Sequence, residues 1–254
     1  MSMTLFSLLV AGVRADPGRT VRIMPVGDSI TRGSYLVDKG LANKKGGGWR
    51  KILQDSLRAA GVPFEFVGEL DYHSYGDKGV VDPAFSPKHH GLAGFSNKRI
   101  RTGGSVPTPQ DVLKAKGVKE IVVPGIVEVL RRNRPDVILL MSGANGFDAK
   151  ERDLLIRTIV EHFKGELFVA NITPQKNPRP GWDRVDAYNA SLPGLVRSLK
   201  ERGANIHFID MNGALSADDL LADGVHPNAS GNRKIAQTWL EALQKKNGDS
   251  HHPE

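Results

Sequence analysis

Short apolar runs alternate along the chain with longer segments whose apolar residues recur at helical spacing. The apolar runs predict five β-strands, at residues 21–26, 64–68, 136–141, 166–172 and 206–211. The intervening segments predict helices at about 49–60, 121–133, 151–163, 183–202 and 229–245, with Pro193 expected to kink or divide the fourth. Strand followed by helix, repeated in this way, favours the α/β class: a three-layer α/β/α sandwich around a five-stranded parallel sheet.

The chain of 254 residues is long enough for one sizeable core, and we expect a single domain over residues 16–245. Residues 71–111 show no periodic pattern and contain glycine and proline throughout. A loop of that length in a compact domain is usually functional or an insertion. Residues 246–254 read as a disordered tail.

The composition excludes several classes of protein. Apolar residues make up 39% and charged residues 25%, and no uninterrupted apolar stretch is long enough to span a membrane. The formal charge of +7 comes from scattered basic residues without a nucleic-acid-binding motif, which favours a solvated basic surface. Since there are no cysteines, disulfides, cysteine-ligated zinc and a thiol nucleophile are excluded.

The N-terminus resembles a secretory signal. Leu5 to Val13 is an apolar run, and the small residues Val13 and Ala15 suit cleavage before Asp16. The usual basic residues before the run are missing, so a mobile or docked N-terminal segment is the alternative. We expect residues 1–15 to lie outside the fold and the protein to be secreted or periplasmic.

Polar residues gather where the predicted strands end. Ser29 follows the first strand in "GDSI", residues 142–146 follow the third, and residues 171–173 follow the fourth. In parallel α/β sheets ligands bind beyond the carboxyl ends of the strands, so these residues are expected at one edge. The structural alternative for Ser29 is a helix cap.

A serine hydroxyl becomes a strong nucleophile only when a base takes its proton and a third group orients that base. His226 in "DGVHPN" supplies a base beyond the last strand, and Asp223 stands three residues before it. His89 and His90 are adjacent, but no third ligand stands at a useful spacing. We therefore expect no metal and no cofactor.

The motifs "GDSI" and "DGVHPN" resemble the first and last blocks of the SGNH (GDSL-type) hydrolases, which have a flavodoxin-like fold. The resemblance implies that Ser29 is the nucleophile, His226 the general base and acid, and Asp223 the orienting carboxylate. It also implies an oxyanion hole formed by the Ser29 backbone N–H, Gly94 in "HHGLAGFS" and Asn145 in "SGANG".

The third block departs from the family pattern, because Gly146 stands where an aspartate is usual. Asp148 is one candidate to replace the hydrogen bonds of that aspartate, and a turn with positive φ at Gly146 is the other. We expect Asn145 to be more mobile and turnover to be reduced, which restoring Asp at Gly146 tests.

The segments "MPVGDSIT", "FEFVG" and "KHHGLAGFS" resemble the branch with acetylxylan esterases, carbohydrate esterase family 3. The resemblance implies deacetylation of an O-acetylated carbohydrate or another small acyl ester, without a nucleic-acid or membrane partner. Phe95, Phe147 and Trp182 are candidates to stack on a sugar or line an acyl slot, with packing as the alternative for each. A lysophospholipase or thioesterase, a carbohydrate-binding protein with a weakened site and a basic nucleic-acid-associated domain are the competing functions.

Overall fold

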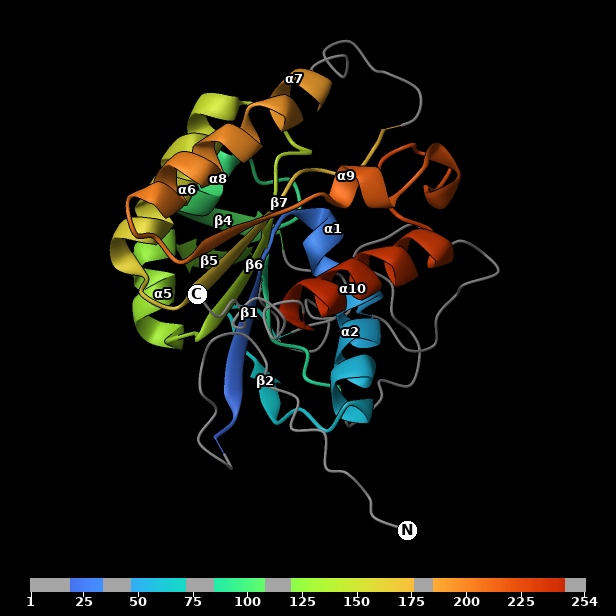
Figure 1. Cartoon of the computed structure of the whole chain (residues 1–254), viewed down its shortest axis with the longest axis horizontal. Helices are drawn as coiled ribbons and strands as arrows, with labels where there is room; N and C mark the ends of the chain where they lie inside the picture. The colour runs from blue at the N-terminus through green and yellow to red at the C-terminus, as the bar shows by residue number, and fades with distance from the viewer. Residues whose placement is uncertain (1–18, 34–46, 72–84, 108–119, 176–184, 245–254) are drawn as a thin grey trace, which may run out of the picture.

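A central parallel sheet organises the computed structural model, which describes residues 19–33, 47–71, 85–107, 120–175 and 185–244. Its main strands are β1 (Val21–Gly27), β2 (Phe64–Phe66), β6 (Val137–Met141), β7 (Glu166–Ala170) and β8 (Ile206–Ile209). They lie in the order β2-β1-β6-β7-β8, and the first four of these strands are labelled in Figure 1. The short strand β3 (His90–Gly91) also pairs with β1. This is the 2-1-3-4-5 order of flavodoxin-like sheets, and the predicted fold class is confirmed.

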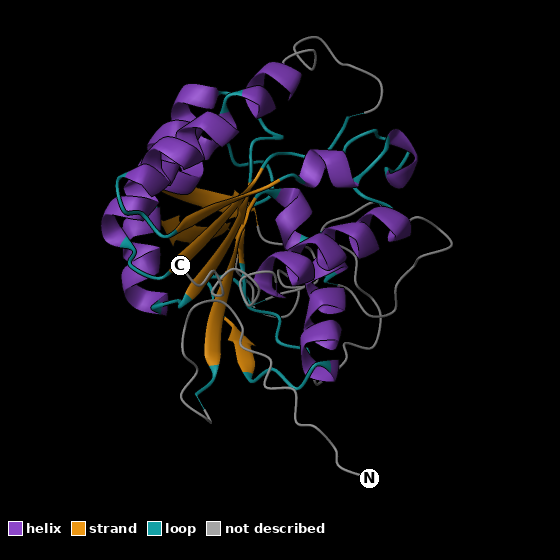
Figure 2. Ribbon diagram, in the orientation of Figure 1, coloured by secondary structure: helices purple, strands orange, loops and turns teal. Residues whose placement is uncertain are grey.

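Helices cover both faces of the sheet (Figure 2). On one face lie α2 (Gly48–Ala59) and α10 (Ala229–Gln244), which pack against each other. The other face is covered by α3 (Asn97–Thr102), α5 (Ile126–Asn133), α6 (Ala149–His162) and α8 (Leu192–Glu201). The short helices are α1 (Ser29–Arg32), α7 (Val185–Ala190) and α9 (Met211–Ala214), and a 3₁₀ turn spans Ala217–Asp219.

The apolar run of β6 explains its central position. Ile138 and Leu140 belong to the core cluster on the side of α5 and α6, whereas Leu139 and Met141 belong to the cluster on the side of α2 and α10. A strand buried on both faces has no solvent-facing positions, so its sequence is a continuous apolar run rather than an alternation of apolar and polar residues. In the second cluster the indole rings of Trp49 (α2) and Trp239 (α10) lie 6.0 Å apart and are fully buried.

The predicted helix at 121–133 is wrong in its first part. Residues Glu120–Pro124 form strand β5, which pairs antiparallel with β4 (Gly103–Pro107), and helix α5 begins only at Ile126. The β-branched residues of "EIVVP" fit an extended backbone, and Pro124 lacks the N–H that a helix interior needs. Gly125 then caps α5.

The expectation of an irregular segment over 71–111 is corrected where the structure describes it. It contains β3, α3 and β4. Helix α3 follows a Ser96 cap whose side chain accepts a hydrogen bond from Arg99 N. His89 and His90 are buried, and His90 is the first residue of β3 rather than part of a loop.

The predicted helix at 183–202 is divided, as one of the two expectations for Pro193 required. α7 ends at Ala190 and α8 begins at Leu192, with proline in its first turn, where a missing N–H is tolerated. The predicted segments 1–15 and 246–254 lie outside the described residues. No helix of the described residues is long and apolar enough to cross a membrane.

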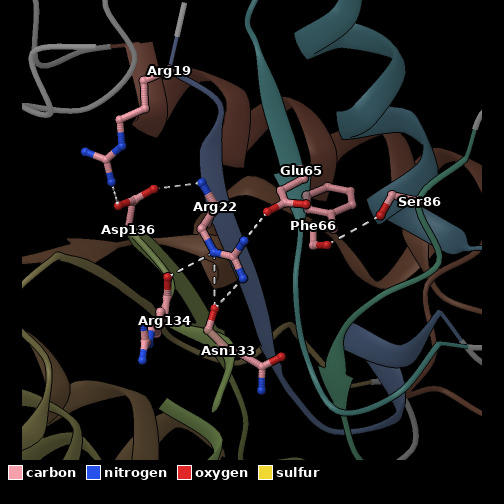
Figure 3. Close-up of polar contacts among 8 residues, drawn as sticks. All are labelled: Arg19, Arg22, Glu65, Phe66, Ser86, Asn133, Arg134 and Asp136. Atoms are coloured by element: carbon pink, nitrogen blue, oxygen red, sulfur yellow. Dashed lines mark hydrogen bonds and ion pairs between the residues drawn. The ribbon is translucent and has the colours of Figure 1, made fainter. Parts of the chain in front are cut away.

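At the amino ends of β1 and β2, the Arg22 side chain links these strands to the end of α5 (Figure 3). Its guanidinium donates to the carbonyl oxygens of Asn133 (Nη2–O, 2.8 Å) and Arg134 (Nε–O, 3.1 Å) at the end of α5, and pairs with Glu65 of β2. The Arg22 backbone N–H donates to Asp136, 2.9 Å away. One side chain thus joins two neighbouring strands to the carbonyls that the end of a helix leaves unpaired.

Candidate active site

The turn after β1 brings Ser29 to the carboxyl edge of the sheet. A Cβ on Gly27 would lie 2.0 Å from the Met141 carbonyl oxygen and 2.3 Å from Thr31 Oγ1, so only glycine fits this close approach. Asp28 caps α1, its Oδ1 accepting a hydrogen bond from Ile30 N at 3.0 Å. Ser29 is therefore the first residue of a short helix and is half-buried.

Arg50 of α2 holds α1 from its other end. Its buried guanidinium donates to the carbonyl oxygens of Thr31 (3.0 Å), Arg32 (2.9 Å) and Pro87 (3.1 Å). A helix as short as α1 has little cooperative stability of its own. Arg50 supplies partners to carbonyls that would otherwise be unpaired.

Ser29, His226 and Asp223 form a hydrogen-bonded chain. Ser29 Oγ lies 2.9 Å from His226 Nε2, and His226 Nδ1 lies 2.6 Å from Asp223 Oδ2. The carboxylate partner assigns the ring proton to Nδ1, which leaves Nε2 able to accept the Ser29 hydroxyl proton. The arrangement is chemically capable of activating Ser29 as a nucleophile.

Asp223 is fixed by backbone donors from the same loop. Its Oδ1 accepts hydrogen bonds from Val225 N (3.0 Å) and His226 N (3.1 Å). Burial raises the pKa of this carboxyl, but the hydrogen bonds from the His226 ring and the two backbone N–H groups outweigh it, and the net pKa lies below the ordinary value. Asp223 is therefore ionised at neutral pH and able to stabilise a protonated His226.

Asp28 joins the turn of Ser29 to the loop after β6. Its Oδ2 accepts hydrogen bonds from Gly143 N (3.3 Å) and Ala144 N (3.2 Å). Burial raises the pKa of Asp28, and the hydrogen bonds together with the charge of His226 only partly compensate. A carboxylate is thus kept out of water between two segments expected to act on the same substrate atom.

The two segments expected to supply further oxyanion donors are in direct contact. Asn145 Nδ2 donates to the carbonyl oxygen of Phe95, 3.2 Å away, and Phe95 directly follows Gly94. A side-chain amide carries two N–H groups, so one remains for a substrate oxygen. Gly94 is exposed, has φ +75°, and would have no atom within 4 Å of a Cβ. Its backbone is therefore open on that side.

Gly146 adopts φ +142°, a conformation that L side chains rarely take. Of the two alternatives for this position, the structure has the glycine-specific turn. Asp148 instead caps α6, its Oδ1 accepting from Glu151 N at 3.0 Å. A Cβ at Gly146 would meet no atom within 4 Å, but an L side chain at this backbone conformation would be strained.

The three aromatic candidates have different positions. Phe95 is 0% exposed, and the Arg99 guanidinium lies 3.9 Å from its ring centroid. The expectation of a sugar-stacking ring is corrected here, because a fully buried ring packs in the core. Phe147 is half-buried beside Asn145, with φ +46°, and its ring meets that of Tyr188 edge to face. Trp182 lies outside the described residues.

Sequence reasoning missed the polar groups that hold the site together. Asp28 was visible as the neighbour of Ser29 in "GDSI", whereas Asn97, Ser142 and Tyr188 carry no local signal that joins them. The described residues contain no group of three His, Cys, Asp or Glu side chains placed to hold a metal ion.

Residues 23–239 match the family model described as GDSL-like Lipase/Acylhydrolase. Among curated proteins, the chain is 28% identical over 262 residues to a multidomain esterase of Ruminococcus flavefaciens, covering 96% of this chain. The chain spans only 31% of the length of that relative.

Two solved structures are similar to this fold. A carbohydrate esterase family 3 protein from Talaromyces cellulolyticus superposes with a TM-score of 0.66 at 20% identity, covering 91% of this chain and all (100%) of the other. A family 3 carbohydrate esterase from Clostridium thermocellum superposes with a TM-score of 0.61 at 25% identity, covering 89% and 100% of the two chains.

Proposed function

Because this chain belongs to the GDSL-like lipase/acylhydrolase family and is an ester hydrolase, we propose that it removes acetyl groups from O-acetylated carbohydrates. Ser29 is the nucleophile, His226 the general base and acid, and Asp223 the group that orients His226. The observation that carries the proposal is the continuous hydrogen-bonded chain from Asp223 through His226 to Ser29 Oγ.

In the acylation step Ser29 Oγ attacks the ester carbonyl carbon while its proton passes to His226 Nε2. The carbonyl oxygen takes up negative charge, and the bond to the leaving alcohol then breaks. His226 returns the proton to that alcohol. Asp223, ionised and 2.6 Å from Nδ1, stabilises the protonated ring between these two transfers.

Deacylation repeats the sequence with water as the nucleophile. His226 removes a proton from the water, the oxygen attacks the acetyl carbon, and the Ser29 oxygen leaves with the proton. In both steps the Ser29 N–H, the Gly94 N–H and the Asn145 side-chain amide donate to the developing oxyanion. Such donors contribute about 10²–10³ each to the rate.

The similarity to a family 3 carbohydrate esterase from Clostridium thermocellum, at 25% identity, supports a carbohydrate ester as the substrate. The preference for acetyl groups rests on the resemblance of "MPVGDSIT", "FEFVG" and "KHHGLAGFS" to the acetylxylan esterase branch. Phe147, half-buried and two residues after Asn145, is our candidate to contact the acyl group or the sugar. Aromatic and apolar side chains near a few polar groups are typical of small-ligand sites.

A substrate panel tests the assignment. Acetate release from acetylated xylan should be measured beside hydrolysis of p-nitrophenyl esters from acetyl to long acyl chains, with Ser29→Ala as the blank. We expect activity on acetyl esters that falls as the acyl chain lengthens. Preference for long chains, without acetate release from xylan, supports a lysophospholipase or thioesterase instead.

Covalent labelling separates an enzyme from a carbohydrate-binding protein with a weakened site. A fluorophosphonate should attach to wild-type protein and not to Ser29→Ala, because only an activated serine reacts. Absence of labelling in folded wild-type protein contradicts the proposed mechanism.

We also propose that the protein is exported after removal of residues 1–15. Expression in a secreting host and N-terminal sequencing of the secreted protein should give a chain that starts at Asp16. Retention of the full chain inside the cell contradicts this.

A further inference from the structure

Three buried side chains from separate segments form a closed ring of hydrogen bonds. Ser142 Oγ donates to Asn97 Oδ1 at 2.7 Å, and Asn97 Nδ2 donates to the Tyr188 hydroxyl oxygen at 2.9 Å. The Tyr188 hydroxyl then donates to the Ser142 carbonyl oxygen at 2.8 Å. Each member both gives and receives one bond, so the ring fixes the orientation of all three side chains.

The ring connects the two segments that carry Gly94 and Asn145. Ser142 follows β6 and begins the loop of Asn145, while Asn97 begins α3, two residues after Phe95. The Phe95 carbonyl oxygen is the acceptor for the Asn145 amide. The ring therefore determines the separation between the loop of Asn145 and the segment of Gly94.

Tyr188 also sets the position of Gly143. A Cβ at Gly143 would lie 2.3 Å from the Tyr188 hydroxyl oxygen, and Gly143 has φ +136°. The N–H groups of Gly143 and Ala144 donate to Asp28. The loop is thus held by Asp28, from the turn of Ser29, and by Tyr188, from α7.

Arg152 of α6 fixes Tyr188 in turn. Its guanidinium carbon lies 4.7 Å from the centroid of the Tyr188 ring, and it donates to the Tyr188 carbonyl oxygen and, at 2.9 Å, to Ser191 Oγ. The Arg152 side chain is only 3% exposed. The Tyr188 member of the hydrogen-bonded ring is therefore held by a buried cation.

We infer that Tyr188 and Asn97 are positioning residues for ester hydrolysis, which hold Asn145 where its amide meets the developing oxyanion. They act through Ser142 and Gly143 and do not touch the substrate. The inference rests on the proposed role of Asn145 as an oxyanion donor.

The expected effect follows from the geometry of donors. A donor contributes when it lies about 2.7–3.1 Å from the oxyanion, and a displacement of about 1 Å costs up to about 10² in rate. Burial raises the pKa of the Tyr188 hydroxyl above its ordinary value, so it remains a donor throughout the range in which the enzyme is assayed.

Tyr188→Phe tests the inference, because it removes the hydroxyl oxygen from the hydrogen-bonded ring and leaves the aromatic side chain in place. We expect kcat and kcat/KM for p-nitrophenyl acetate to fall together by about tenfold to a hundredfold, with KM within about threefold of wild type. The inhibition constant of an alkyl trifluoromethyl ketone, which forms an oxyanion on the serine, should rise by the same factor.

Two control variants test whether a lower kcat comes from a displaced Asn145 or from a general loss of stability. Thr158→Ala removes a side-chain hydrogen bond within α6, to the Leu154 carbonyl oxygen at 2.8 Å, and Arg22→Ala weakens the opposite edge of the sheet. Both should keep kcat within about twofold, because neither side chain belongs to the hydrogen-bonded ring or holds the loop of Asn145. Equal losses of kcat in Thr158→Ala and Tyr188→Phe overturn the inference, as does a Tyr188→Phe enzyme with wild-type kcat.

Ser142→Ala opens the hydrogen-bonded ring by removing its smallest side chain. It is the variant to use if Tyr188→Phe folds poorly. It should lower kcat about threefold to tenfold, and combining it with Asn97→Ala should add little, because both changes open the same ring. Fully additive effects overturn the inference. If Ser29→Ala retains activity, the proposed function itself fails, and this outcome is separate from a failure of Tyr188→Phe alone.

Discussion

The two edges of the central sheet use polar side chains in opposite ways. At the amino edge Arg22 is partly exposed, and its partners are helix-end carbonyls and a surface carboxylate (Figure 3). At the carboxyl edge Asp28 is buried, and its burial raises the pKa of its carboxyl. The polar groups of the first edge keep contact with water, whereas the charged form of Asp28 at the second edge carries a cost of desolvation.

Ser29→Ala should have the largest effect on activity and almost none on folding. The hydroxyl contributes one hydrogen bond to His226, and in the proposed mechanism it is the group that forms the covalent intermediate. We expect kcat/KM for p-nitrophenyl acetate to fall by at least about 10³. The thermal midpoint should stay within a few degrees of wild type, and a large decrease would mean that Ser29 is chiefly structural.

Gly143→Ala should damage both activity and stability. The new Cβ would lie 2.3 Å from the Tyr188 oxygen at a backbone φ of +136°. We expect a loss of about 1–3 kcal/mol in the free energy of unfolding and at least about tenfold in kcat. Gly194→Ala in α8, where a Cβ meets no atom within 4 Å, is the matched control and should be neutral or stabilising by up to about 1 kcal/mol.

Asp28 and Asp223 should give stability profiles of opposite sign with pH. The folded pKa of Asp28 is raised, so its contribution to stability is greatest below the unfolded pKa and is lost as pH rises through the folded pKa. Wild type should therefore lose stability relative to Asp28→Asn as pH rises from acid to neutral.

The folded pKa of Asp223 is lowered, so its contribution is present above the unfolded pKa and is lost as pH falls through the folded pKa. Wild type should gain stability relative to Asp223→Asn over the same rise in pH. Denaturant unfolding of the three proteins across this range measures both differences, and profiles of the same sign contradict the assignment.

Arg22→Ala should have the smallest effect on catalysis. It removes hydrogen bonds to the Asn133 and Arg134 carbonyl oxygens and the pair with Glu65. We expect a decrease of about 1–2 kcal/mol in the free energy of unfolding, with kcat unchanged within about twofold. A loss of activity larger than the loss of folded protein would show that the two edges are coupled.

Local patterns in the sequence were sufficient for the main sheet and for the residues that gather at its carboxyl edge. The apolar runs of β1 and β6 are long enough to predict buried strands. The motifs "GDSI" and "DGVHPN" come after strands of that sheet. Parallel strands bring their carboxyl ends together wherever they stand in the chain. Hence Ser29 and His226 were expected near each other although they are 197 residues apart.

The missed features depend on contacts between distant segments. Strand β5 exists because it pairs with β4, which is rich in glycine and proline and carries no strand signal of its own. Ile121 and Pro124 of β5 continue the three-residue spacing of Val127 and Leu130 in α5, so local sequence favoured the wrong element. The ring of Ser142, Asn97 and Tyr188 joins residues up to 91 positions apart, and no periodicity identifies it.

The indole pair of Trp49 and Trp239 provides an optical signal separate from catalysis. These are two of the three tryptophans of the chain, buried where α10 packs on α2. The emission of the two indoles should change when either helix detaches, because the rings then enter water. Since α10 follows the loop of His226 and α2 carries Arg50, the signal reports on elements that adjoin the site. Fluorescence and hydrolysis followed in the same cuvette would therefore reveal whether heat inactivates the enzyme before or after these two helices separate.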